Sequence, residues 1–170
     1  MIRTDPLLRL RGASKVASDR VIVATTRLYR EAFLDPANWR TGTYDALWED
    51  FASTAKVQAR KDARILTAGS AAADAYAGIV PRHSTIATTV LLDRKGKATV
   101  VLVTARFEAF GRTLSGASNT RFDSAGRFFF ERVGGGWKIV SYDVHRHDRP
   151  VAKTAPSPAG VPATSPTGAA

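Results

Sequence analysis

Three residues near the end of the chain alternate in a pattern that suits a metal ion. Asp143, His145 and His147 are each two positions apart, so in an extended strand their side chains lie on one face. Imidazole nitrogens and a carboxylate are ordinary ligands of zinc. Arg146 and Arg149 lie beside them and would repel a cation, so we interpret the segment as the solvated end of a strand. We expect no metal ion and no other cofactor.

General acid–base catalysis would need a titratable side chain in a pocket, with its pKa moved towards neutrality by burial. Tyr142 and Asp74 are the two candidates for this role. Tyr142 and Asp143 are adjacent on a strand and point to opposite faces. Asp74 and Tyr76 are two apart and do not share a helical face. Because no Asp-His or Asp-Tyr pair is visible, we expect no catalytic residue. If the protein is nevertheless an enzyme, Tyr142 and Asp74 are the candidates for the acid or base.

Aromatic residues form the remaining candidate site. Tryptophan and tyrosine rings can line a ligand pocket, although they more often pack in a core. Phe128, Phe129 and Phe130 cannot all lie on one strand face. Either Phe129 faces the helices and the other two point outward, or the reverse, and the outward rings form an apolar patch of the kind that marks a partner surface. The predicted pocket or interface residues are Trp39, Tyr44, Trp48, Tyr76, Phe128, Phe130 and Tyr142.

The charge of the chain favours anionic neighbours. Its 170 residues carry a formal net charge of +10, which attracts nucleic acid, anionic lipid or anionic polymer. The basic residues are spread out and form no block of five or six, so we expect no nucleic-acid site. Lys56, Arg60 and Arg64 form one cationic helical stripe that is suited to an anionic surface. There is no cysteine, which excludes disulfides.

The sequence leaves two localisations open. It contains no run of 18 apolar residues, and its first residues include arginine but no apolar segment of a signal peptide. Either the protein is cytoplasmic, or a membrane anchor upstream of Met1 is missing and the domain lies outside the membrane.

Hydrophobic periodicity predicts helices first and strands afterwards. Apolar spacing favours helices from about Ala13 to residue 34, over 44–53 and over 54–66, and a short helical turn that stops at Gly78 and Pro81. Period-two patterns then predict strands over 82–92, 97–110, 127–133 and 137–146. Residues 1–12 are a predicted flexible leader, 13–148 a single domain, and 149–170, rich in proline, alanine and threonine, a disordered tail.

One segment carries a family resemblance. Phe130–Ile139, which reads FERVGGGWKI, resembles the last hairpin of the nuclear transport factor 2-like superfamily, where a glycine-rich turn precedes Trp-(Lys/Arg)-Ile. The order of elements over residues 15–147 is similar too. The resemblance implies an α+β fold, cone-shaped and cystatin-like, in which N-terminal helices pack in the concavity of a bent antiparallel sheet. Within the superfamily the chain looks nearest to actinobacterial envelope domains such as mammalian-cell-entry-associated proteins.

The resemblance leaves two classes of function open, because the superfamily includes both scaffolds and enzymes. The leading hypothesis is a non-enzymatic binding or assembly domain of a bacterial cell-envelope complex, located outside the cytoplasm. It would hold a protein partner, or a second copy through the sheet face, or an apolar small ligand. The alternative is a small cyclase, isomerase or dehydratase acting on a hydrophobic ligand in the cone.

Overall fold

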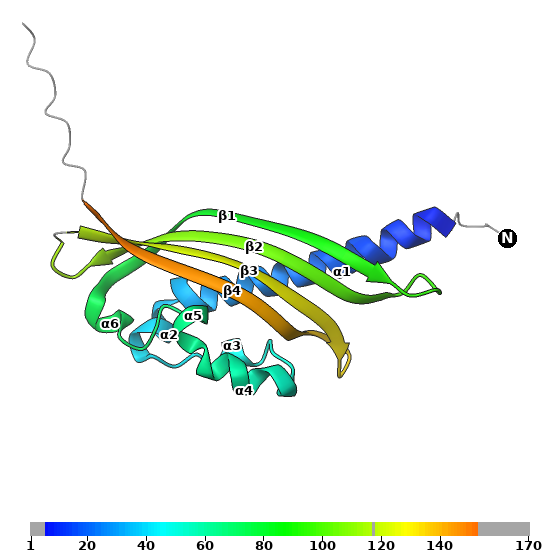
Figure 1. Cartoon of the computed structure of the whole chain (residues 1–170), viewed down its shortest axis with the longest axis horizontal. Helices are drawn as coiled ribbons and strands as arrows, with labels where there is room; N and C mark the ends of the chain where they lie inside the picture. The colour runs from blue at the N-terminus through cyan, green and yellow to red at the C-terminus, as the bar shows by residue number, and fades with distance from the viewer. Residues whose placement is uncertain (1–5, 117, 153–170) are drawn as a thin grey trace, which may run out of the picture.

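The computed structural model describes residues 6–116 and 118–152, and it confirms the predicted α+β class (Figure 1). A layer of helices is followed by four long antiparallel strands. The helical elements are α1 (Pro6–Tyr29), the π-helical turn η1 (Arg30–Leu34), α2 (Pro36–Thr41), α3 (Asp45–Trp48), α4 (Ser53–Lys61), α5 (Ala63–Leu66) and α6 (Ala72–Ala75). The strands are β1 (Tyr76–Leu92), β2 (Ala98–Thr113), β3 (Ser118–Val133) and β4 (Gly136–Ala152).

The sheet is a simple meander in the order β1-β2-β3-β4. The alternation predicted for β2 is confirmed, since Val101, Val103, Ala105, Phe107 and Ala109 are all buried and their neighbours are not. Glycines allow the tight turns at the sheet's end, because backbone with positive φ is disfavoured for other residues. One stands between β1 and β2 at Gly96, and two more stand between β3 and β4.

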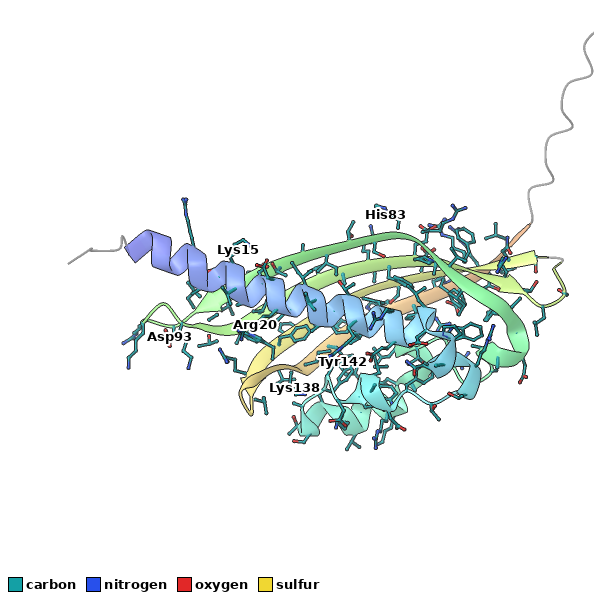
Figure 2. All side chains as sticks on the ribbon, turned by 180° about the vertical axis from the view of Figure 1, so that it is seen from behind. Lys15, Arg20, His83, Asp93, Lys138 and Tyr142 are labelled. Carbon is teal, nitrogen blue, oxygen red and sulfur yellow. The ribbon has the colours of Figure 1, made fainter. Side chains whose placement is uncertain are left out.

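The inner face of the sheet is covered by α1 and by the shorter helices beyond it (Figures 1 and 2). Helix α1 runs along the strands and buries Ala17, Val21 and Leu28 at helical spacing. Its serine Ser18 is hydrogen-bonded to Thr88 of β1 at 2.6 Å. No helix in the described ranges is long and apolar enough to cross a bilayer.

Aromatic rings fill the space between the end of α1 and the sheet. Tyr29 stacks on Phe107 with ring centroids 5.0 Å apart and meets Phe128 edge-on at 6.2 Å. Phe33 lies 5.1 Å from Phe107 and 6.1 Å from Phe122. The concavity of the bent sheet is therefore packed with side chains at this level.

The boundaries of the helical part differ from those predicted. Helix α1 begins at Pro6 rather than at Ala13, because proline is well suited to the first helical position, where no N–H is needed. The predicted leader is thus helical from residue 6, and residues 1–5 lie outside the described ranges. The segment 54–66 is divided at Asp62 into α4 and α5, and within 44–53 only Asp45–Trp48 and Ser53, the first residue of α4, are helical.

The strands are longer than the sequence pattern indicated. β1 starts at Tyr76 and runs through Gly78 and Pro81, which were predicted to end a helical turn. Shifts in its register at both positions accommodate these residues at the edge of the sheet. β3 starts at Ser118 rather than at Arg127. β4 continues to Ala152, so residues 149–152 belong to the sheet rather than to a tail. The rest of the predicted tail, 153–170, lies outside the described residues.

Candidate functional site

An open cleft of about 1090 Å³ lies within the helical layer. Its walls come from the segment before α3, from α4 and α5, from the loop before α6, and from two side chains of β4. Three of the aromatic residues predicted from sequence, Tyr44, Trp48 and Tyr76, line it together. They are separated by up to 32 positions in sequence, and the turns between the short helices bring them to one place.

The cleft is hollow because small side chains line it. Ala63, Ala68, Ala71, Ala72 and Ala75 contribute to its surface. Ala68 and Ala72 are buried and belong to the hydrophobic core. Alanine presents apolar surface without filling the space in front of it, so these residues add apolar area and leave the volume open, while polar side chains such as Thr43, Asp45 and Ser70 line the rest of the cleft.

Arg146 joins the cleft to the core. Its guanidinium donates hydrogen bonds to the carbonyl oxygens of Arg64, at 2.9 Å, and of Thr67, and it pairs with Asp148 at 2.6 Å. The same group lies over the rings of Phe33 and Phe122, at 5.2 and 5.1 Å from their centroids. The arginine therefore satisfies carbonyls near the end of α5, where helical backbone lacks partners.

Tyr44 is fixed at the other side of the cleft. Its hydroxyl donates to the carbonyl oxygen of Gly69 at 3.1 Å. Burial raises the pKa of the Tyr44 phenol above its ordinary value. The phenol therefore stays protonated at neutral pH and serves as a hydrogen-bonded wall of the cleft.

The candidate acids and bases are not brought together. Tyr142 points from β4 towards the helices (Figure 2), where its hydroxyl donates to Asp62 at 2.7 Å and its ring meets Phe51 edge-on at 5.7 Å. Burial, together with the Asp62 carboxylate, raises the pKa of Tyr142. Asp74 is exposed on α6 and is absent from the lining of the cleft. Tyr142 thus ties β4 to the junction of α4 and α5.

Three of the other predicted aromatic residues are core residues. Phe128, Phe130 and Trp39 are each 1% exposed, so the suggestion that Phe128 and Phe130 form an outward patch is wrong. The reverse arrangement is the one observed: Phe128 and Phe130 are buried, and Phe129 lies half-buried on the outer face. An extra residue in β4 opposite this position, Val140, keeps the pairing intact.

Asp143, His145 and His147 lie at the outer face of β4. The Asp143 carboxylate is 2.5 Å from the Arg127 guanidinium and 3.3 Å from the His145 imidazole. The hydrogen bond from Arg127 lowers the pKa of Asp143. Within the described ranges no three histidine, cysteine or acidic side chains are arranged to hold a metal ion.

A shallow groove of about 480 Å³ crosses the outer face and includes all three histidines of the chain. Strand register aligns His83, Glu108, Asp123 and His147 in one row across the sheet, and His83 stands on the outward side (Figure 2). The two carboxylates of the row are already bound, since Arg121 lies 2.9 Å from Glu108 and 3.1 Å from Asp123. The two carboxylates therefore belong to an ion-pair network around Arg121.

Sequence reasoning missed a partly buried charge cluster at the end of α1. Arg27 forms a hydrogen-bonded ion pair with Asp50 and lies 3.8 Å from Glu31. One carboxylate oxygen of each acid is buried without a hydrogen-bond partner among the described residues. The spacing of Arg27 and Glu31, four apart in a helix, was a visible signal. Asp50 follows an irregular turn, so no pattern placed it there.

Glu31 gives a testable dependence of stability on pH. Burial raises its pKa, as it does that of Asp50. A carboxyl group whose folded-state pKa is raised contributes stability that is present below about pH 4 and is lost as the pH rises through the folded-state pKa. We expect Glu31→Gln to be more stable than the natural chain by about 1 kcal/mol at pH 7, and this gain to vanish near pH 4.

Urea denaturation of Glu31→Gln between pH 4 and pH 7 checks this expectation. Glu131→Gln, at an exposed position of β3, is the matched control and should show no such trend. A gain that is constant with pH would contradict the assignment of the effect to ionisation of Glu31.

Comparisons with known proteins identify the fold. No family model matches the chain, and no curated protein does. Among solved structures, the crystal structure of a hexachlorocyclohexane dehydrochlorinase (LinA, type 2) is similar, with a TM-score of 0.52 and 13% sequence identity, over 89% of this chain and 98% of that chain. At this identity the likeness shows the fold alone. The chain therefore has the cone-shaped nuclear transport factor 2-like fold, with helices packed in the bend of an antiparallel sheet.

Proposed function

We propose that the chain is a non-catalytic binding domain and that the cleft is its binding site. The supporting observation is where the open space of the molecule lies. Aromatic rings occupy the concavity of the sheet, whereas the cleft is open and has alanine and aromatic walls. Its lining contains no histidine. Tyr44 and Asp148 are held by Gly69 and Arg146, and Asp45, the remaining carboxyl group of the lining, has no histidine or second unpaired carboxyl group in the lining to act with, so the wall offers contact surface rather than an acid–base pair.

The wider setting that we propose is an assembly in a bacterial cell envelope, with the domain outside the cytoplasm. The sequence resemblance to envelope domains and the composition of residues 153–170 support this setting. The outer face of the sheet is left uncovered by helices (Figure 1) and carries Leu102 and Phe129 half-buried. A protein partner or a second copy would dock there.

Saturable binding of a neutral apolar dye tests the proposed binding function. Ala71 is exposed and lines the cleft, so Ala71→Trp fills the space without removing a core contact. We expect Nile red to bind the natural chain at one site and to bind Ala71→Trp about tenfold or more weakly, because the dye and the new ring compete for one volume. Fluorescence titration gives both dissociation constants.

Ala37→Trp is the matched control, because Ala37 is exposed on α2 and lies outside the lining of the cleft. It should bind the dye as the natural chain does. Absence of saturable binding to the natural chain, or equal weakening by both substitutions, would refute the cleft as the binding site.

The alternative function, a small cyclase, isomerase or dehydratase, is favoured by the structural likeness to a dehydrochlorinase. The buried carboxyl groups of Glu31 and Asp50, whose pKa values are raised, are the kind of group that catalysis uses. Turnover of hydrophobic carbonyl or halogenated substrates by the purified natural chain distinguishes the two functions. Product formation by the natural chain that is lost in Asp50→Asn would show that the protein is an enzyme rather than a binding domain.

A further inference from the structure

Two arginines at the cleft form no salt bridge within the described part of the chain. Arg60 lies in the last turn of α4 and Arg64 lies in α5, and both line the cleft. They are exposed, and neither forms a salt bridge with a described carboxylate. The third arginine of the lining, Arg146, is already paired with Asp148. The charge available to a ligand therefore comes from Arg60 and Arg64.

The cleft that these arginines line also has apolar side chains in its wall. The same cleft has Tyr44, Trp48 and Tyr76 in its wall and five alanines around them. Its volume, about 1090 Å³, is slightly above the range of about 300–1,000 Å³ that is typical of small-molecule clefts. A cleft of this kind is complementary to a molecule with an apolar body and an anionic end.

Besides Asp148, which is paired with Arg146, the lining of the cleft has one carboxylate. Asp45 lies in the lining and is exposed at the start of α3. It forms no salt bridge with either arginine. Guanidinium groups bind carboxylates, sulfates and phosphates through paired hydrogen bonds. A ligand with an ammonium group has no acceptor for these hydrogen bonds. The two free guanidinium groups therefore select the sign of the ligand's charge.

We propose that the cleft binds a single-chain anionic amphiphile, with its apolar body against the alanine and aromatic walls and its anionic group on Arg60 and Arg64. This inference rests on the proposed binding function and adds the chemical class of the ligand. The occupant is one molecule bound within the cleft, so a membrane surface is a separate outcome of the test.

Competition with Nile red tests the charge preference. Dodecanoate, dodecanol and dodecyltrimethylammonium share one chain length and differ in the end group. Below their micelle concentrations, we expect dodecanoate to displace the dye about tenfold more effectively than the other two, because charge-assisted hydrogen bonds to guanidinium are available to it alone. Calorimetry should give one dodecanoate per chain.

Paired substitutions locate the effect. In Arg60→Gln/Arg64→Gln, dodecanoate should bind about tenfold more weakly, while Nile red binds as before. Arg11→Gln/Arg20→Gln removes the same charge from exposed positions of α1 and should leave both ligands unaffected. A circular dichroism melt of each variant verifies that it is folded.

Each other outcome overturns the inference in a distinguishable way. Equal displacement by dodecanoate and dodecanol, with dye binding intact, would overturn the charge preference and leave the proposed binding function standing. Failure of Nile red itself to bind would overturn both the charge preference and the proposed binding function. Co-sedimentation with phosphatidylglycerol vesicles without one-to-one binding of dodecanoate would assign the arginines to a membrane surface instead.

Discussion

Replacement of Arg146 by methionine is expected to lower the free energy of unfolding by about 3 kcal/mol. The methionine chain keeps part of the packing over Phe33 and Phe122 but donates no hydrogen bond. The carbonyl oxygens of Arg64 and Thr67 lose their donor, and a buried polar group without a partner costs about 1–3 kcal/mol. The interaction of the cation with the two rings adds to the loss. Denaturant titration followed by circular dichroism measures the change.

Arg149→Met is the matched control for this effect. Arg149 lies three residues further along β4, its side chain is half exposed, and its distance to Asp123 is 3.9 Å. An exposed pair of this kind contributes about 0–1 kcal/mol. Equal losses in the two variants would show that Arg146 is not the buried anchor between β4 and the helices that we describe.

Phe128→Ala is expected to destabilise the fold by about 3–5 kcal/mol, the range for removal of a buried phenylalanine ring. Phe128 is 1% exposed and meets Tyr29 edge-on, so its loss leaves a cavity below α1. Alanine at the neighbouring Phe129, half-buried on the outer face, should cost about 1 kcal/mol, because much of its ring area stays in water.

The two phenylalanine variants together test the direction in which β3 faces. Urea unfolding of both variants under one set of conditions gives the difference directly. A larger loss at Phe129 than at Phe128 would reverse the assignment of the two faces. It would also contradict the alternation of β3, which places Phe128 and Phe130 on one face and Phe129 on the other.

The sheet was the most predictable part of the fold. Alternation of Val101, Val103, Ala105 and Phe107 depends only on the period of a strand, and a long strand repeats that signal several times. The bounds were less predictable. Pro81 and Gly78 are ordinary signals for a loop, yet at an edge of the sheet a strand tolerates both, because one side of its backbone has no partner to lose.

The sequence indicated that aromatic residues line a pocket, but it did not indicate which of them do so. Tyr44, Trp48 and Tyr76 were selected as aromatic residues of a pocket, and the structure places them around one space. Trp39 and Phe128 were selected for the same reason, but they lie deeper in the core and do not line the cleft. The difference is set by the turns between α2 and α6. The exact path of such short helices depends on tertiary packing rather than on local periodicity.

Arg146 shows a further limit of the sequence pattern. Beside His145 and His147 it was interpreted as a charge that would repel a metal ion. In the structure it points inward to Phe33 and the carbonyl of Thr67. Alternation places Arg146 on the face opposite the two histidines. The pattern predicted an apolar face there. The hydrogen-bond partner of Arg146, the carbonyl oxygen of Thr67, lies 79 positions earlier in the sequence, where no local pattern points to it.

The two borders of the sheet differ in how they resist the addition of foreign strands. An open border exposes unpaired N–H and C=O groups and templates aggregation. On β4, the segment around Phe51 occupies the border at Ile139 by pairing with its backbone. On β1, Pro81 removes one N–H group and the local irregularities break the spacing of the rest. Concentrated samples of the chain should therefore resist fibril growth along β1, and Pro81→Val should weaken that resistance.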